Sequence, residues 1–572
     1  MTEENKTTDA PVPGSPDYPL HSELTIGAYL KQQVAIDPDH EFVVYPDRDL
    51  RWTYKDFDER TDALAKGLLA IGMKPGDHLG VWARNIPDWL TFMYASAKIG
   101  VVMVTVNPVY KSHELDYVLK QSDMKALCVI DAYRDVDYLQ IIRDLVPESL
   151  NVQRGFLHSE AYPFLENLIY MGPEKHRGFY SVPELLLLGQ HKPDSSLEWA
   201  QGQFDNNDVV MMQYTSGTTG FPKGVMLTHR NILNNGFYIG EGQKLGAEDR
   251  VCLPVPFFHC FGCVLGVMAC LTHRCTMLIV EEFNAELVLQ ALDKEKATAV
   301  YGVPTMFIAE LNHPDFDSFD LSHLRTGIMA GSPCPPETMR EVMERMNMRD
   351  VTICYGLTET SPVFTQTSVD DDIPHKCETV GRAHPPVEVR VLDVNDGHIC
   401  EPGEHGELCC KGYNVMKGYY NKPEETDMIL RRHADGQIWA HTGDVGYMDE
   451  DGFVYLDSRI KRMIIRHDGF KVFPSMIENV ISRHPAVHQC SVVGCTDKDH
   501  VQGRLPFVYV VLDPEADKKK RQIVRELRQL CKEELPEYVQ PVSYKFISEM
   551  PMTPVGKVDY RKLEEEITPR DY

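Results

Sequence analysis

The stretch from Tyr214 to Gly224 reads Tyr-Thr-Ser-Gly-Thr-Thr-Gly-Phe-Pro-Lys-Gly and comes directly after the apolar run 209–212. It holds five hydroxyl side chains, three glycines and one lysine. Glycines allow close approach of the backbone, and consecutive N–H groups form an anion-binding nest. A loop of this composition after a strand therefore predicts a polyphosphate site. A flexible surface turn is the alternative, and the apolar run before the loop disfavours it.

The loop is not of the Walker A type. That motif needs a serine or threonine directly after its lysine to bind Mg²⁺. Here Lys223 lies between Pro222 and Gly224. The sequence therefore predicts a phosphate-binding loop of another kind.

This loop resembles the ATP-binding signature of the adenylate-forming superfamily, which comprises acyl-CoA synthetases, luciferases and the adenylation domains of peptide synthetases. The resemblance covers residues 20–566, and further motifs follow in that superfamily's order and spacing. These motifs are Tyr355-Gly356-Leu357-Thr358-Glu359-Thr360, His441-Thr442-Gly443-Asp444, Ser458-Arg459-Ile460-Lys461 and Pro554-Val555-Gly556-Lys557.

The resemblance implies a nucleotide site assembled from these motifs. Tyr355 is expected near adenine, and Asp444 and Arg459 are expected at the ribose. Thr358 is expected at a phosphate, and Glu359 would bind Mg²⁺, a hard cation held by carboxylates and phosphates. The implied ATP-binding residues are Thr215, Ser216, Gly217, Thr218, Thr219, Gly220, Lys223, Gly331, Ser332, Pro333, Tyr355, Gly356, Thr358, Asp444, Arg459 and Lys557.

The resemblance also implies a reaction in two steps with ATP and coenzyme A as co-substrates. A carboxylate attacks the α-phosphorus of ATP, pyrophosphate leaves, and the thiol of CoA then displaces AMP from the acyl-adenylate. Negative charge builds on the phosphoryl oxygens in the first step, so cations placed there dominate catalysis. Lys557 is the implied catalytic cation; without the other motifs it would be read as a surface lysine. The other implied catalytic residues are Glu359, Thr358 and His259.

A second conformation is implied for the second step. Lys461 matches the hinge about which the small domain rotates between the half-reactions. The segment Gly469, Phe470 and Lys471 is then expected to line the CoA tunnel. Glycine at 469 suits a place where a thin chain passes close to the backbone, and it suits a hairpin turn equally well.

The acyl group is expected beside the aromatic segment 256–262. His259 in this segment would gate the substrate channel, although a lone histidine in an apolar run is usually structural. The implied acyl-binding residues are His259, Phe258, Tyr301 and Gly331. The wider lining expected here is apolar and consists of Phe258, Phe261, Tyr301, Met306, Phe307, Ile328 and Met329. Such a wall suits a fatty or aromatic acid and disfavours an amino acid, whose ammonium would want a buried carboxylate.

The stretches 106–110 and 113–115 are most similar to medium- and long-chain fatty acyl-CoA synthetases. The sequence therefore predicts an ATP-dependent fatty acid–CoA ligase. An aryl acid–CoA ligase shares every motif and is the first alternative. A free-standing adenylation enzyme that loads a carrier protein is the second; the chain ends about fifteen residues after Lys557, which favours a ligase. A nucleotide sensor without catalysis is disfavoured because Lys557 is present.

Helical and strand patterns alternate along the first part of the chain. A capping signal at 53–56 precedes an apolar helical stripe over 57–71, and 79–82 is typical of a strand. A helix over 86–99 and a strand over 101–104 continue this order. Such alternation predicts parallel βαβ units.

The expected fold class is α/β. A disordered leader over 1–20 is expected, then a large adenylation domain over 21–460 with βαβ layers and a small β-rich subdomain from about 380. A small mobile α+β domain over 461–572 would carry the catalytic lysine.

The net charge narrows the classes of partner that are expected for this protein. The 58 Lys and Arg against 85 Asp and Glu give a net charge of −27, which argues against nucleic acid as a partner. ATP and CoA are anions, so their sites need local positive charge despite the net negative charge of the chain. A basic cluster around the hinge would supply it; its members are Arg459, Lys461, Arg462, Arg466 and Lys471. The sequence shows no signal peptide and no integral membrane segment, so a cytoplasmic protein is expected. The oligomeric state stays open, a homodimer included.

Fifteen cysteines without framework spacing indicate thiols in a reducing compartment. The cysteines between 252 and 275, with His259 and His273, could be read as a metal cluster. Because they lie in apolar segments and no second C-x-x-C follows at zinc-ribbon spacing, buried thiols in a core are the preferred interpretation.

Overall fold

The structure is a computed structural model. It describes residues 20–215, 222–332, 334–385, 387–459, 462–466, 471–496, 504–514, 516, 519–552 and 558–568. The chain forms two compact units, one of residues 1–389 and 410–441 and one of residues 390–409 and 442–572. The division passes through the strands β19 (Val387–Leu392), β20 (Gly406–Gly412) and β23 (Ile438–Met448). The predicted domain boundary after residue 460 stays a prediction.

One sheet of the first unit has the strand order β21-β11-β10-β4-β3-β5-β8-β9. Its strands are β3 (His78–Trp82), β4 (Val102–Val106), β5 (Met124–Val129), β8 (Asn167–Tyr170), β9 (Phe179–Ser181), β10 (Val209–Thr215), β11 (Lys223–Thr228) and β21 (Gly418–Tyr419). The neighbours from β10 to β9 are parallel, whereas β11 and β21 join as antiparallel strands. The predicted parallel βαβ units are therefore confirmed for this sheet.

The second sheet of this unit has the order β18-β17-β16-β15-β14-β12-β13-β1-β2. Its strands are β1 (Glu41–Tyr45), β2 (Leu50–Thr53), β12 (Arg250–Leu253), β13 (Thr276–Ile279), β14 (Ala299–Gly302), β15 (Thr326–Ala330), β16 (Asp350–Gly356), β17 (Val363–Gln366) and β18 (Arg382–Ala383). The strands from β16 to β1 are parallel, and the pairs at both edges are antiparallel. Parallel sheets of this kind bury both faces.

Helices connect and cover these strands. They are α1 (Ile26–Ile36), α2 (Tyr54–Ala70), α3 (Pro87–Lys98), α4 (Ser112–Gln121), α5 (Tyr138–Leu145), α6 (Val182–Gln190), α7 (Asp194–Gln201), α8 (His229–Gly242), the π-helix η3 (Phe261–Met268), α9 (Ala269–His273), α10 (Ala285–Lys294), α11 (Pro304–Leu311), α12 (Pro336–Arg345), α13 (Ile373–Glu378) and α14 (Pro423–Ile429). Helix α2 begins with the predicted capping box, in which the side chains of Thr53 and Asp56 each accept from the other's backbone N–H. None of the helices in the described ranges is long and apolar enough to cross a membrane.

The two faces of the second sheet belong to different hydrophobic clusters. Tyr301, Ile328 and Ala330 join the larger cluster, together with α8 and η3. Met329 and Phe307 join a second cluster with α10, α11 and α12. Successive strand residues point to opposite faces, so the apolar run 328–330 divides between two cores. The cysteines at 252, 260, 263, 270 and 275 are all buried, as expected for thiols that fill a core.

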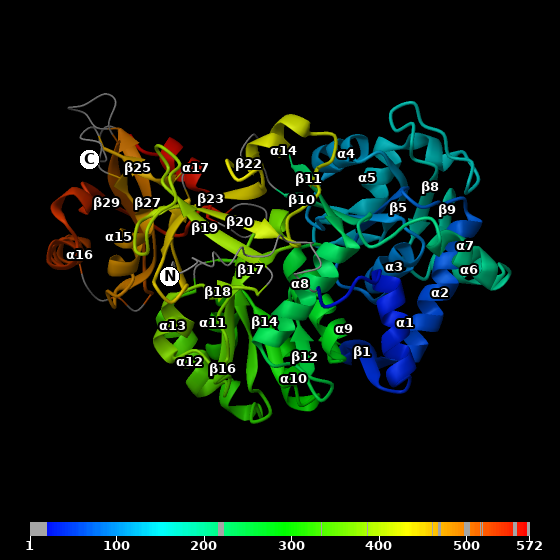
Figure 1. The fold of residues 1–572 in the computed structure, drawn as a ribbon, viewed down its shortest axis with the longest axis horizontal. Helices are drawn as coiled ribbons and strands as arrows, with labels where there is room; N and C mark the ends of the chain where they lie inside the picture. The colour runs from blue at the N-terminus through cyan, green and yellow to red at the C-terminus, as the bar shows by residue number, and fades with distance from the viewer. Residues whose placement is uncertain are drawn as a thin grey trace, which may run out of the picture. The chain divides into compact units, whose positions relative to one another are not determined.

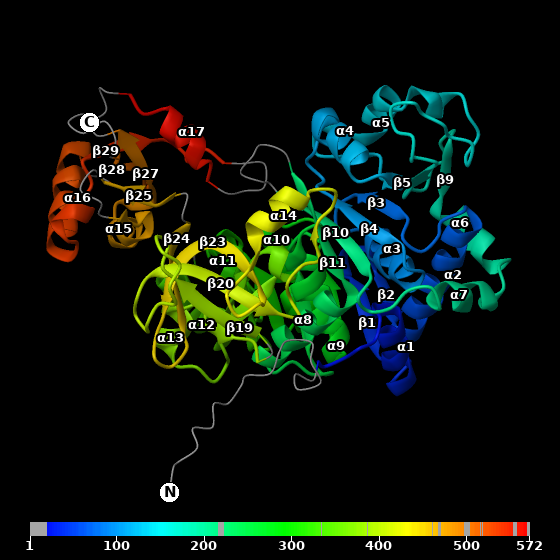
Figure 2. The same cartoon turned by 45° about the horizontal axis from the view of Figure 1, so that its top comes forward.

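The second unit contains a three-stranded sheet of order β27-β28-β29. The elements of this unit from residue 454 onward are β24 (Val454–Arg459), β25 (Ile464–Ile465), β26 (Lys471–Val472), α15 (Pro474–Ile481), β27 (Val487–Thr496), β28 (Arg504–Leu512), α16 (Lys520–Glu534), β29 (Ser543–Ile547) and α17 (Tyr560–Glu565). Helices α15 and α16 pack on one face of this sheet, as both views show (Figures 1 and 2). The α+β pattern predicted beyond residue 461 is confirmed.

Candidate functional site

The two ends of the phosphate-loop motif pair with each other as strands. Strands β10 and β11 are antiparallel, with Tyr214 opposite Gly224 and Thr215 opposite Lys223. The ends of the motif therefore belong to strands, which corrects the prediction of one continuous loop from 214 to 224. The physical reason is that these four residues complete the antiparallel backbone ladder between β10 and β11. Residues 216–221 lie outside the described residues.

Lys223 contacts Tyr419, a residue that none of the sequence motifs contains. Its Nζ lies 4.9 Å from the centroid of the Tyr419 ring. The Tyr419 hydroxyl donates to Glu359 Oε1 at 2.6 Å. Burial, and next the neighbouring carboxylate of Glu359, raise the pKa of Tyr419, so its hydroxyl stays a donor at neutral pH. Lys223, Tyr419 and Glu359 thus form one chain of contacts from the start of β11 to the predicted Mg²⁺ ligand.

Glu359 lies in a short 3₁₀ helix, Thr358–Thr360, directly after β16. The backbone carbonyl of Glu359 accepts from the N–H of Met416 at 2.9 Å, which holds this turn against the segment before β21. A Cβ at Gly356 would lie 1.8 Å from the carbonyl oxygen of Pro362, so only glycine fits there. Glu359 is half-buried, and its carboxylate offers the oxygen donors that Mg²⁺ prefers.

Thr358 connects this turn with the segment expected at the acyl group. Its Oγ1 lies 3.7 Å from the Sγ of Cys260, and that sulfur lies 3.5 Å from Nδ1 of His259. The N–H of Phe261 donates to the same Nδ1 at 3.1 Å. A ring nitrogen that accepts is unprotonated, so the neutral ring carries its proton on Nε2. The exposed His259 is therefore oriented by its own loop, and Cys260 joins it to Thr358.

Three residues from separate elements meet beside this loop. Gly331 has φ +88°, and a Cβ there would lie 3.2 Å from Val303 Cγ1 and 3.8 Å from the Phe261 ring. The rings of Phe261 and Tyr301 stack at 6.4 Å. Tyr301 is fully buried, and its hydroxyl accepts from Nε2 of Gln243 at 2.8 Å. Phe261, Tyr301 and Gly331 are brought together, and we call these three residues the aromatic wall.

Two residues of the expected lining lie elsewhere. Phe307 and Met329 belong to the second cluster, on the other face of the sheet, which corrects the prediction that they share one wall with Tyr301. The reason is strand alternation, which places Met329 opposite to Ile328. Phe258 is half-buried and its ring stands edge-on to that of His259 at 6.4 Å.

The predicted adenine-side residues lie at the ends of β15 and β16. Tyr355 is half-buried, and its ring contacts Phe364 edge-on at 4.9 Å. Ser332 follows Gly331 and is exposed. Both strands are parallel neighbours, so their carboxyl ends meet at one edge of the sheet.

The predicted ribose residues belong to the second unit. Asp444 in β23 pairs directly with Arg459 in β24 across an antiparallel ladder. Asp444 is 7% exposed, and its N–H donates to Thr442 Oγ1 at 3.1 Å. The turn before it is fixed because the N–H of Gly443 donates to Glu407 Oε1 at 3.0 Å. Two residues fifteen positions apart in sequence are thus neighbours.

Several predicted site residues lie outside the described part of the chain, and their roles stay predictions. These residues are Ser216, Gly217, Thr218, Thr219, Gly220, Pro333, Lys461, Gly469, Phe470 and Lys557. Lys471 is placed by its backbone in β26, opposite Ile465.

The sequence matches known proteins along most of its length. Residues 30–420 match the AMP-binding enzyme family, and residues 476–557 match the AMP-binding enzyme C-terminal domain. Putative acyl-CoA synthetase YngI of Bacillus subtilis (strain 168) is 47% identical, with 96% of this chain and 97% of that protein covered. Medium-chain acyl-CoA ligase ACSF2, mitochondrial, of Homo sapiens is 35% identical, with 95% and 87% covered.

Solved structures have the same fold. ATP-bound MatB from Rhodopseudomonas palustris has a TM-score of 0.80 at 25% identity, with 96% of this chain and 100% of that chain covered. The anthranilate CoA ligase AuaEII in complex with anthranoyl-AMP has a TM-score of 0.80 at 22% identity, with 96% and 97% covered, and it supports the fold alone. The resemblance to adenylate-forming enzymes is thereby confirmed. The chain belongs to the AMP-binding enzyme family.

Proposed function

We propose that this protein is an AMP-forming acid–CoA ligase that activates medium- to long-chain fatty acids with ATP and Mg²⁺. The ligase activity is supported by the family and by relatives named as acyl-CoA synthetases and ligases. The choice of acid rests on the aromatic wall. Phe261 of this wall stacks on Tyr301 and donates its N–H to His259. The neighbouring Cys260 contacts Thr358, the predicted phosphate residue, so the wall lies next to the predicted phosphate site.

In the first half-reaction the chain must hold two anions together. Glu359 would hold Mg²⁺, which supplies charge stabilisation at the phosphates, and Tyr419 orients that carboxylate. Lys223 adds a cation at the start of β11, beside Tyr419. Lys557 would bridge the carboxylate and the α-phosphate. The second half-reaction follows when CoA reaches the acyl-adenylate and AMP leaves.

The wall favours an apolar acid. Phe261 and Tyr301 are buried rings, and a Cβ at Gly331 would crowd Val303 at 3.2 Å, so a glycine keeps this wall free of a further side chain. Each methylene buried in such a channel contributes roughly 0.8 kcal/mol, which is about fourfold in catalytic efficiency. Efficiency should therefore rise with chain length until the channel is full. An aryl acid–CoA ligase is the second candidate, because stacked aromatic rings also suit a planar acid.

The test is an ATP- and CoA-dependent AMP-release screen over straight-chain acids of graded length, with benzoate- and cinnamate-type acids alongside. We expect the highest kcat/KM for a straight chain of medium to long length. A ring-bearing acid preferred over every straight chain would move the assignment to the aryl ligase. Release of AMP only when a carrier protein replaces CoA would move it to a carrier-loading enzyme.

A pair of matched variants tests the wall itself. Phe261→Ala enlarges the proposed channel, so the preferred chain length should shift. Phe307→Ala is the control, because it removes a phenyl ring of the same size from the cluster on the opposite face of the sheet. This change should lower the stability of the protein and leave the order of preference among acids unchanged. Equal shifts in both variants, or none in Phe261→Ala, would contradict the placement of the acid.

A further inference from the structure

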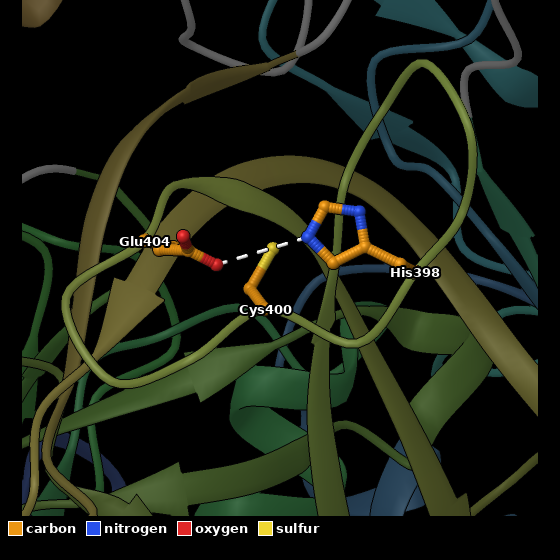
Figure 3. A group of neighbouring side chains, drawn as sticks. All are labelled: His398, Cys400 and Glu404. Atoms are coloured by element: carbon orange, nitrogen blue, oxygen red, sulfur yellow. Dashed lines mark ion pairs between the residues drawn. The ribbon is translucent and has the colours of Figure 1, made fainter.

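A hairpin of the second unit gathers three side chains of the kind that bind zinc. His398, Cys400 and Glu404 lie between β19 and β20, and one ligand atom from each lies within 4.8 Å of the others. Figure 3 shows the imidazole and the carboxylate on either side of the Cys400 thiol in this view. The set combines nitrogen, sulfur and oxygen donors. None of these residues belongs to the predicted nucleotide, acyl or CoA sites.

The spacing of the donors suits one small ion. Nε2 of His398 lies 3.7 Å from Oε2 of Glu404. Two ligands of one tetrahedral zinc lie about 3.4 Å apart, since Zn–N and Zn–O bonds are about 2.1 Å long. The two atoms are thus within a small side-chain adjustment of that geometry. Cys400 supplies a third, softer donor, which favours zinc over Mg²⁺ or Ca²⁺.

A carboxylate outside the three donors orients the histidine. Nδ1 of His398 lies 2.7 Å from Oδ1 of Asp396. When Nδ1 carries the proton and donates it to Asp396, the lone pair of the neutral ring is on Nε2, the nitrogen that faces Glu404. Metal-binding histidines usually donate their other N–H to a carboxylate in this way. The contact with Asp396 thus favours the tautomer that a metal ion requires.

The backbone that carries these side chains is fixed. The N–H of Cys400 donates to Val391 at 2.9 Å, and Leu392 pairs with Ile399. The N–H of Gly403 donates to the carbonyl of Met448, at the end of β23, at 2.9 Å. Ligands on a preformed hairpin lose little conformational entropy when an ion binds.

We propose that His398, Cys400 and Glu404 form a zinc site, with Asp396 as the positioning residue and water as the fourth ligand. Binding releases the thiol proton of Cys400 to solvent, and the thiolate, the imidazole Nε2 and the carboxylate each donate an electron pair. The ion would link the side chains of His398, Cys400 and Glu404 across this preformed hairpin. It does not depend on the proposed ligase activity, and either assignment can fail alone.

The test uses metal-free full-length protein with Zn²⁺ and, as a spectroscopic probe, Co²⁺. Wild type should bind one equivalent of Zn²⁺ by calorimetry. Co²⁺ should give a thiolate-to-cobalt charge-transfer band that Zn²⁺ abolishes. Cys400→Ser should remove this band, and His398→Ala and Glu404→Gln should each lower Zn²⁺ affinity at least about 10-fold. Asp396→Asn should lower it by about 10-fold or more, because the ring is no longer oriented.

Two matched controls separate this site from adventitious binding. Cys490→Ser removes another half-buried thiol, and His375→Ala removes another histidine whose Nδ1 contacts an aspartate, Asp372. Both should keep the band and the affinity of wild type. A wild-type protein without the band, or a Cys400→Ser variant that retains it, would overturn the proposal. Circular dichroism of each variant verifies that the exposed hairpin tolerates the change.

Discussion

At the level of single residues, the chemistry of the candidate site depends on contacts between motifs. Tyr419 is contained in none of them, yet it touches Lys223 by its ring and Glu359 by its hydroxyl. A hydrogen bond to a carboxylate is stronger than one between neutral groups. Tyr419 therefore sets the direction in which Glu359 presents its oxygens.

Removal of the charged residues should cripple the first half-reaction. Glu359→Gln removes the proposed Mg²⁺ ligand, and Asp444→Ala removes the proposed ribose anchor. Loss of a positioned charge in a closed phosphoryl site costs on the order of 3 kcal/mol, so ATP–pyrophosphate exchange should fall by at least about 100-fold. Near-normal exchange in either variant would contradict the assignment.

Tyr419→Phe should have an intermediate effect. The variant keeps the ring beside Lys223 and loses only the hydroxyl that orients Glu359, a change worth roughly 1.5 kcal/mol or about 10-fold in exchange rate. The Mg²⁺ concentration that gives half-maximal exchange should also rise in this variant. Tyr420→Phe is the control, since the neighbouring hydroxyl contacts Asp123 instead. Equal effects of both changes would show that Tyr419 is merely structural.

At the level of elements, burial in helix α11 creates a testable dependence of stability on pH. Glu310 is 1% exposed, and among the described residues its Oε2 has no hydrogen-bond partner. Burial raises the pKa of Glu310 from 4.5 to about 8. The native state therefore holds one more proton than the unfolded state between these two pH values.

The sign of this effect follows from proton linkage. Because the native state binds more protons, the free energy of unfolding falls as pH rises from 4.5 towards 8, by at most about 1.4 kcal/mol per unit. The glutamine of Glu310→Gln cannot ionise, so this pH dependence should vanish. The free energy of unfolding of the variant, relative to that of wild type, should therefore be higher at pH 8 than at pH 6. Urea unfolding at several pH values measures it. Parallel profiles for the variant and wild type would contradict the prediction.

At the level of the whole molecule, the two half-reactions should be separable by mutation. Lys557→Ala should abolish adenylate formation and still convert a synthetic acyl-adenylate with CoA. Lys461→Pro should do the opposite, since proline fixes φ near −65° and blocks a hinge. Gly469→Trp should spare adenylation and obstruct the pantetheine path. Single-turnover assays of each step decide the matter, and equal damage by Lys557→Ala to both steps would make that lysine structural.

The sequence by itself determined the local features of this protein. The capping box at Thr53, the parallel βαβ order and the motif around Glu359 are short-range patterns, and hydrogen bonding and side-chain periodicity act within a few residues. Their chemistry could be read without knowing which strands are neighbours. The family followed from the same motifs, because their order along the chain is itself a property of the sequence.

Only the tertiary structure decided which distant residues meet. Tyr419 reaches Glu359 because β21 pairs with β11, and Cys260 reaches Thr358 although 98 positions separate them. The apolar run at 328–330 shows no preference for either face in sequence; the helices that cover each side of the sheet divide it between two cores. Strand order and sheet faces are set by long-range burial of apolar surface, which no local pattern records.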